Sequence, residues 1–82
     1  MPVPTSPAKP TKTVDTSGLA CPMPIVRTRQ AIDQLASGDV LEIISTDRGS
    51  LTDIPSWAGT LGHTLLDARE DGQTFVYLIK KG

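Results

Sequence analysis

The sequence predicts an α/β (α+β) two-layer sandwich, with two helices packed on one face of a small mixed sheet of four strands. The chain has 82 residues, which is enough for one domain. Its hydrophobic pattern changes in the order β-α-β-α-β-β, because β-branched runs alternate with stripes at helical spacing. Charged residues make up 21% and hydrophobic residues 38% of the chain, a balance that favours a folded domain over a disordered one.

The N-terminal residues differ from the rest of the chain in composition. Four of the seven prolines fall within the first ten residues. Proline-rich segments favour extended backbone without internal hydrogen bonds. We therefore predict that residues 1–10 form a disordered tail and that residues 11–82 form the folded domain.

The first strand and the first helix follow the tail. Lys12–Thr16 contains β-branched residues and ends at Ser17-Gly18, which predicts a short strand and then a break. Proline is favoured where a helix begins and glycine just after it ends, so a helix is predicted from Pro22 or Pro24 up to Gly38. One stripe at helical spacing supports this helix: Ile25, Arg29, Ile32 and Leu35 or Ala36.

The second strand and the second helix come next. Val40–Ser45 is mostly apolar on both faces, as expected for a buried central strand. A second helical stripe lies within Ser50–Leu61: Ile54, Trp57, Ala58 and Leu61. Because proline is tolerated in the first turn of a helix, Pro55 predicts a cap near Thr52 or Asp53, whereas a start at Ser50 would cost a kink.

The last two strands are predicted to form a hairpin. Thr64–Glu70 has moderate β propensity, and Thr74–Lys81 is rich in β-branched and aromatic residues. Asp71-Gly72 between them is a strong hairpin signal, because Asp-Gly favours tight turns with positive φ.

Composition excludes several classes of function. Eight basic residues against nine acidic ones leave a net charge of −1, so no basic excess attracts nucleic acid. The single cysteine, Cys21, and the single histidine, His63, allow neither a disulfide framework nor a structural metal site. No apolar run approaches the ~18 residues of a membrane span, and no secretory signal is present. We therefore expect a cytoplasmic protein with a free thiol, and with no metal and no cofactor.

The most informative segment is Gly18-Leu19-Ala20-Cys21-Pro22-Met23-Pro24, which places a thiol at the entrance of a helix. The two prolines stiffen the backbone that leaves the thiol. The positive N-terminal end of the following helix favours the thiolate form. Most free cysteines are buried hydrophobic residues, but two flanking prolines are of no use for packing. We therefore interpret Cys21 as an exposed nucleophile shaped by Gly18, Pro22 and Pro24.

The residue three positions after Cys21 is Pro24, where a Cys-x-x-Cys redox site would have its second thiol. Without that thiol, no internal disulfide can close. A persulfide on Cys21 could leave only by transfer to another molecule. This arrangement favours a sulfur carrier over dithiol–disulfide exchange.

Three stretches together resemble the TusA/SirA family of small sulfur-carrier proteins. They are Asp15–Pro24, which contains the Cys-Pro-x-Pro motif, Thr52-Asp53-Ile54-Pro55, and Tyr77–Gly82. The resemblance covers about residues 12–82. It implies a four-stranded mixed sheet and a sulfurtransferase that acts as a persulfide carrier through Cys21. At Asp47-Arg48-Gly49 the chain departs from the Asp-Pro that this family often has.

The resemblance also implies partner proteins. The donor would be a cysteine desulfurase or a rhodanese-like protein, and the acceptor a DsrE/TusD-like protein. The sulfur would serve tRNA thiolation, molybdenum-cofactor maturation or dissimilatory sulfur metabolism. The residues that we expect to help dock a partner are Met23, Arg27, Arg29 and Asp53, with Asp47 and Arg48 as weaker candidates. We expect a monomer that binds neither nucleic acid nor membrane.

Several of these residues also have a simpler, purely structural interpretation. Arg27 and Arg29 would be solvated charges, Asp53 a helix cap, Trp57 a core residue and His63 a surface or structural residue. Two other functions stay open. One is a non-catalytic protein- or RNA-binding module, and the other is a thiol redox regulator that acts through Cys21.

Overall fold

The structure, a computed structural model, describes residues 10–19 and 23–82. Its elements follow the predicted β-α-β-α-β-β order: β1 (Lys12–Thr16), α1 (Met23–Ile32), β2 (Val40–Ser45), α2 (Ser50–Thr60), β3 (Thr64–Asp71) and β4 (Thr74–Lys80). The predicted tail, residues 1–10, lies outside the described residues except for Pro10.

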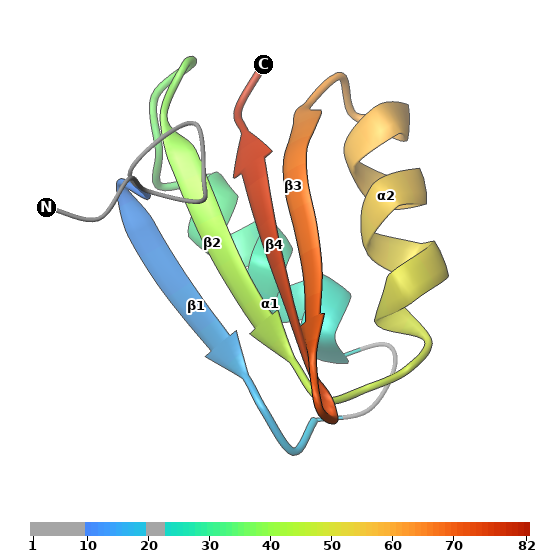
Figure 1. The fold of residues 1–82 in the computed structure, drawn as a ribbon. Coiled ribbons are helices and arrows are strands. Elements are labelled where there is room, and N and C mark those ends of the chain that lie inside the picture. The colour runs from blue at the N-terminus through green and yellow to red at the C-terminus, as the bar shows by residue number, and fades with distance from the viewer. Residues whose placement is uncertain (1–9, 20–22) are drawn as a thin grey trace, which may run out of the picture.

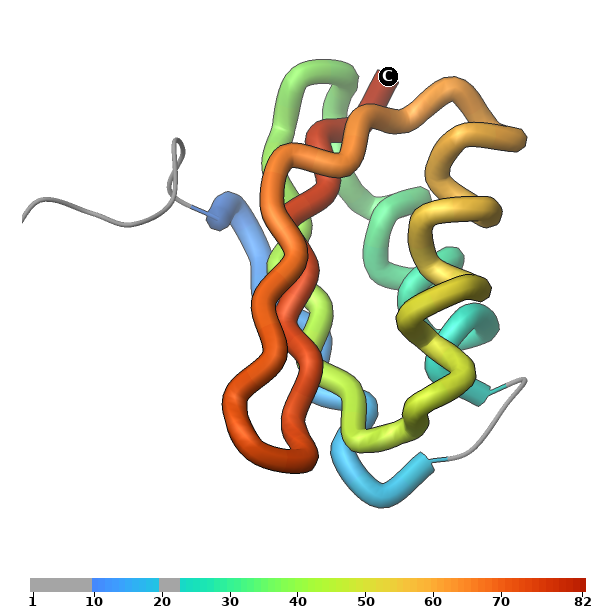
Figure 2. Tube along the Cα trace, turned by 45° about the vertical axis from the view of Figure 1, so that its right-hand side comes forward, coloured from blue at the N-terminus to red at the C-terminus, as the bar shows by residue number. Residues whose placement is uncertain are grey.

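The four strands form one mixed sheet in the order β1-β2-β4-β3. β1 and β2 are parallel, while β4 runs antiparallel to both of its neighbours, β2 and β3. Both helices cover the same face of this sheet (Figure 1), and Figure 2 shows the two layers edge-on. The predicted two-layer sandwich is therefore confirmed.

The core lies between the sheet and the helices. Cross-strand pairs such as Leu41↔Ile79 and Ile43↔Tyr77 direct alternate side chains toward the helices. The sheet contributes Leu41, Ile43, Phe75, Tyr77 and Ile79 to the core cluster, and the helices contribute Ala31, Ile32, Ile54 and Ala58. Each of these residues is at most 5% exposed.

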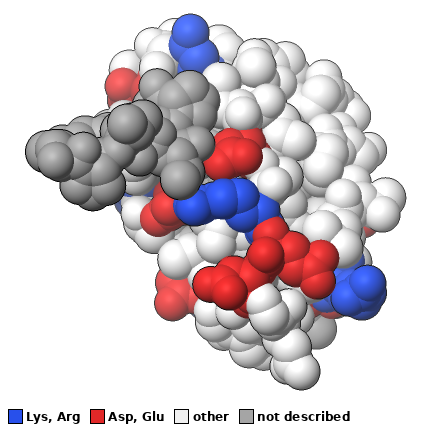
Figure 3. Space-filling view, viewed as in Figure 1, with Lys and Arg blue, Asp and Glu red and all other residues white. Residues whose placement is uncertain are grey.

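The opposite face of the sheet carries charged side chains. The register Glu42↔Leu78 and Asp67↔Leu78 alternates charged residues with apolar ones across the strands. Figure 3 shows acidic and basic groups gathered over this face of the molecule. Charge of this kind discourages association between sheets.

α1 is shorter than predicted, because it ends at Ile32 rather than at Gly38. The N–H groups of Gln34 and Leu35 donate to carbonyls three residues earlier, so the chain tightens into turns there. The predicted stripe is also partly wrong. Arg29 is exposed, whereas Thr28 is buried and satisfies its hydroxyl by donating to the Pro24 carbonyl at 2.6 Å.

α2 begins at Ser50, so the predicted cap at Thr52 or Asp53 is wrong. Gly49 holds the cap position without a side-chain hydrogen bond, and Asp53 is an acidic residue of the first turn. Pro55 therefore lies inside the helix, where it cannot donate to the carbonyl of Leu51. Leu51 is 40% exposed, so this turn of the helix lies at the surface of the molecule.

The predicted hairpin joins β3 to β4. Asp71 pairs with Thr74, so the two loop residues are Gly72 and Gln73. Gly72 has φ +63° and Gln73 does not have positive φ, which is the pattern of a type II′ turn. The register shifts between Leu65 and Asp67, which is an irregularity typical of an edge strand.

A buried hydroxyl pair holds the start of α2 against β4. The oxygens of Ser50 and Tyr77 are 2.7 Å apart, and both side chains are at most 2% exposed. Burial raises the pKa of Tyr77 above its ordinary value of 10.0, and the charges of Asp47 and Glu70 add to this, while the Ser50 hydrogen bond opposes it. The folded state therefore favours the neutral phenol.

We expect this raised pKa to make the fold sensitive to alkali. The contribution of the neutral phenol is complete below pH 10 and is lost as the pH rises through the folded pKa. Tyr77→Phe should cost about 1 kcal/mol at neutral pH, because Ser50 loses its partner, and should remove this alkaline loss. Urea unfolding of the wild type and the variant across this pH range measures the alkaline loss of stability. Parallel pH profiles of the two unfolding free energies would contradict the prediction. Since Tyr77 is the single tyrosine, tyrosinate absorbance reports its titration directly.

Candidate functional site

The segment that leads from β1 toward α1 is held by its own hydrogen bonds and by β2. The Leu19 N–H donates to the Thr16 carbonyl at 3.0 Å, which closes a tight turn through Gly18. Gly18 has φ +81°, a conformation that favours glycine, and its N–H donates to Thr46 Oγ1 at 2.8 Å. Gly18 therefore both turns the chain and joins it to Thr46, the residue that follows β2.

Asp15 stabilises the same turn from the strand side. Its Oδ1 accepts the Ser17 N–H at 2.9 Å. Hydrogen bonds from the Ser17 side chain and backbone hold the pKa of the Asp15 carboxyl below its ordinary value. The turn is thus supported by a carboxylate that stays ionised at neutral pH.

Cys21, predicted as the nucleophile, and Pro22, predicted to shape its loop, lie outside the described residues, as does Ala20. The described chain resumes at Met23, the first residue of α1. By sequence, Cys21 comes two residues before the helix begins. Pro24, the third predicted shaping residue, is buried in the first turn of α1 and accepts the Thr28 hydrogen bond through its carbonyl.

The loop that contains Cys21 arises at one end of the molecule. β1 and β2 end there, both helices begin there, and the β3–β4 hairpin turns there, at the lower end of Figure 1. The carboxyl ends of parallel strands are a common place for functional sites in α/β folds, because the chain leaves the sheet toward helix N-termini.

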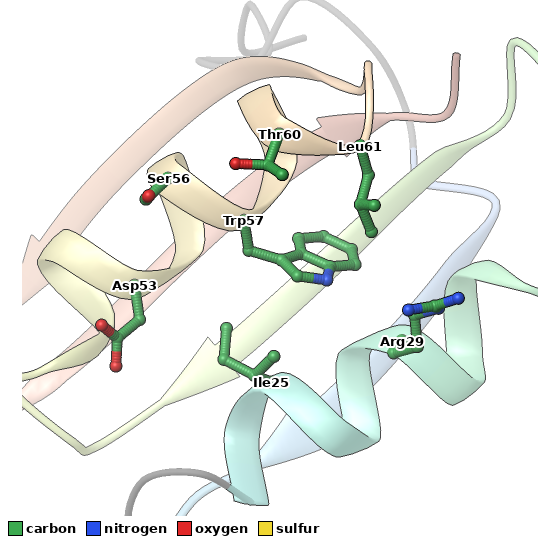
Figure 4. Close-up of a pocket in the computed structure, with 7 residues that line it drawn as sticks. All are labelled: Ile25, Arg29, Asp53, Ser56, Trp57, Thr60 and Leu61. Atoms are coloured by element: carbon green, nitrogen blue, oxygen red, sulfur yellow. The ribbon is translucent and has the colours of Figure 1, made fainter.

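A groove of about 420 Å³ runs between the two helices. Figure 4 shows Trp57 extending from α2 toward α1, with Ile25 and Arg29 facing it from α1. Arg29 and Asp53, two predicted docking residues, line this groove from opposite helices. The complete lining is Ile25, Arg29, Asp53, Ser56, Trp57, Thr60 and Leu61.

The other predicted docking residues lie outside the lining of this groove. Met23 is 37% exposed at the start of α1, and Arg27 is exposed farther along the helix.

Arg29 forms an exposed ion pair with Asp33, one turn away, at 3.6 Å. Such a pair contributes little to stability, so Arg29 can exchange this partner for another at small cost.

Trp57 was expected in the core, and this expectation is only partly right. It packs against the core cluster but stays half-buried in the groove, where its ring lies 5.4 Å from that of His63. His63 is structural as expected, because its Nδ1 accepts the Gly82 N–H at 3.0 Å. Helical spacing identifies a stripe of residues expected to be buried. It does not predict which large apolar residues stay exposed, as Val26, Leu51 and Leu61 do.

A second, smaller pocket of about 270 Å³ lies at the end of the molecule where the loop arises. Its lining comes from the β2–α2 loop and the β3–β4 hairpin: Thr46, Arg48, Gly72, Gln73 and Phe75. Sequence reasoning named Arg48 only as a weak candidate and missed Gln73. The two are 25 positions apart, and no local pattern connects them.

The described residues show two further properties of the chain. None of their helices has the length and apolar character needed to cross a membrane. They also contain no group of three or more His, Cys, Asp or Glu side chains that could hold a metal ion.

Comparison with known proteins identifies the family. The family model of sulfurtransferase TusA matches residues 12–81. YrkI of Bacillus subtilis is 45% identical over 71 residues, which are 87% of this chain and 95% of that protein. The sulfur carrier protein TusA of Allochromatium vinosum is 43% identical over 68 residues, which are 83% of this chain and 90% of that protein.

The fold has a relative among solved structures. The crystal structure of a SirA-like protein from Desulfitobacterium hafniense superposes with a TM-score of 0.76 at 23% identity, covering 87% of this chain and 97% of that one. This likeness concerns the fold alone, whereas the family model and the sequence relatives span nearly all of the described domain. The chain is a member of the TusA family.

Proposed function

We propose that this protein is a sulfur carrier that holds sulfane sulfur as a persulfide on Cys21 and passes it to an acceptor protein. The observation that carries the proposal is the family match over residues 12–81, a region that contains only one cysteine. That cysteine precedes a helix and is followed by proline at the first and third positions after it. The sequence relatives named sulfur carrier protein TusA support the same role.

The chemistry is a transfer of one sulfur atom between thiols. The Cys21 thiolate attacks the outer sulfur of a persulfide on the donor, and a new S–S bond forms. The S–S bond of the donor breaks, and its inner sulfur leaves with the bonding electron pair as a thiolate. The outer sulfur keeps its proton or exchanges it with water, so no external oxidant or reductant is consumed. The second transfer repeats these steps with Cys21 as the leaving thiolate.

The described residues around the loop suit this role. Gly18, held by Thr46, and α1, starting at Met23, fix both ends of a short segment. Anchored ends present a thiol to a protein partner at low entropic cost. The donor would be a cysteine desulfurase or a rhodanese-like protein and the acceptor a DsrE/TusD-like protein, all in the cytoplasm. The sulfur would go to tRNA thiolation, molybdenum-cofactor maturation or dissimilatory sulfur metabolism.

Intact-mass spectrometry tests the proposal. After incubation with a cysteine desulfurase and cysteine, or with polysulfide, the protein should gain one sulfur atom, about 32 Da, which dithiothreitol removes. Alkylation of Cys21 with iodoacetamide beforehand should prevent the gain. A thiol that neither gains sulfur nor reacts with iodoacetamide in the folded protein would contradict the carrier function and favour a binding module. A disulfide-linked dimer or glutathione adduct as the only product would favour the redox regulator.

A further inference from the structure

We propose that the pocket lined by Arg48, Thr46 and Gln73 is a docking site for a carboxylate side chain of the protein that delivers sulfur. This inference rests on the proposed carrier function and specifies how the donor is recognised. The pocket opens at the end of the molecule where the loop with Cys21 begins.

This pocket and the loop that contains Cys21 are physically linked. Thr46 lines the pocket, and its Oγ1 accepts the N–H of Gly18 at 2.8 Å. Gly18 precedes Cys21 by three residues. A partner that contacts the pocket therefore meets the base of the loop that carries the thiol.

Arg48 is available to bind a partner. It is exposed, and within residues 10–19 and 23–82 its side chain has neither an ion pair nor a hydrogen bond. Several other cations of the described chain have partners: Arg29 pairs with Asp33, Arg69 pairs with Asp67, and Lys81 donates to the Leu35 carbonyl. Arg27 and Lys80 are exposed like Arg48, but neither lines this pocket. Guanidinium groups bind carboxylates through two parallel hydrogen bonds, so Arg48 is suited to an acidic side chain.

The loop that carries Arg48 is held by its own hydrogen bonds. The Asp47 N–H donates to Ser45 Oγ at 3.1 Å, and the Gly49 N–H donates to Asp47 Oδ1 at 3.3 Å. The residues on both sides of Arg48 are thereby fixed before a partner arrives. Phe75, 2% exposed, contributes an apolar wall, and Gln73, whose side chain carries an amide donor, also lines the pocket.

The charges near the pocket favour a single carboxylate as its occupant. Asp47 and Asp71 lie next to lining residues in the chain, so a polyanion such as RNA would meet repulsion at the rim. A small free anion would meet one exposed cation, which binds weakly in water. A single carboxylate within a protein interface avoids both problems, because the interface excludes water around the ion pair.

The test compares two ways of loading the protein with sulfur. A protein donor, either cysteine desulfurase with cysteine or rhodanese with thiosulfate, depends on docking, whereas polysulfide does not. Arg48→Glu should lower kcat/KM for the protein donor by ~10-fold or more through KM, and Arg48→Lys should recover part of the loss. The defect should shrink as ionic strength rises.

Lys80→Glu is the matched control, because it makes the same change of charge at an exposed residue at the opposite end of β4. It should load like the wild type from both sources. Unchanged protein-donor kinetics in Arg48→Glu would overturn the docking site, as would a wild type that accepts sulfur from polysulfide and from neither protein donor. An equal loss with polysulfide would show a small-anion site instead. Failure of the wild type with polysulfide as well would count against the carrier function itself.

Discussion

Replacing Cys21 with serine is expected to abolish the passage of sulfur from a donor protein to an acceptor protein. A thiolate is ionised and forms a stable bond to sulfane sulfur. A serine hydroxyl is not ionised at neutral pH and does not form such a bond. Because Cys21 is the only cysteine, no other residue can replace it. We expect the transfer rate to fall below about one thousandth of the wild-type rate. Labelled sulfur supplied through the desulfurase and counted on the acceptor measures this rate.

The same variant separates the carrier from the alternatives. The substitution changes one atom, so the circular dichroism spectrum and the unfolding midpoint should stay close to wild type. If Cys21→Ser still speeds sulfur transfer, the persulfide carrier is wrong and the chain acts as a scaffold that brings donor and acceptor together. If wild type and variant are both inactive but retain the same protein partner, a non-catalytic binding module becomes the better account.

The largest expected loss of stability comes from Ile54→Ala. Ile54 lies in α2, is 0% exposed and belongs to the core cluster between the helices and the sheet. Removing its buried methyl and methylene groups leaves a cavity and should cost about 2–5 kcal/mol. A domain of this size has only about 3–5 kcal/mol of stability, so much of the variant should be unfolded at 37 °C (about 310 K). Urea unfolding followed by Trp57 fluorescence measures the loss.

Leu51→Ala is the matched control for this prediction. Leu51 lies on the same helix, three residues earlier, but is 40% exposed. Its truncation removes a similar number of carbons that contribute much less burial, so the midpoint should move by less than about a third as much. Equal losses in the two variants would mean that helix propensity, rather than packing against the sheet, holds α2 in place.

Much of the fold could be predicted because it depends on local patterns. Val40–Ser45 is mostly apolar on both faces and rich in β-branched residues, and it forms the central strand β2 with those bounds. Asp71-Gly72 ends β3 at the predicted hairpin, because glycine accepts the positive φ that the turn needs. The expected ends of both helices were less accurate, since α1 stops at Ile32 and α2 begins at Ser50.

The start of α2 shows why local rules were insufficient there. Taken alone, Pro55 argues against a helix that begins five residues earlier. In the folded chain, the hydroxyl pair of Ser50 and Tyr77 and the buried side chain of Ile54 hold that first turn against the sheet. These contacts join residues that are distant in sequence, and they offset the hydrogen bond that proline cannot make.

The sequence by itself determined the order of the elements, the single thiol and its Pro-x-Pro helix entrance, because periodicity and proline geometry act over a few residues. Only the tertiary structure decided which side chains share a surface. It brought Arg29 and Asp53 into one groove from separate helices, and Arg48 and Gln73 into one pocket from separate loops. The physical reason is that sheet pairing and helix packing, which act between distant segments, set these juxtapositions.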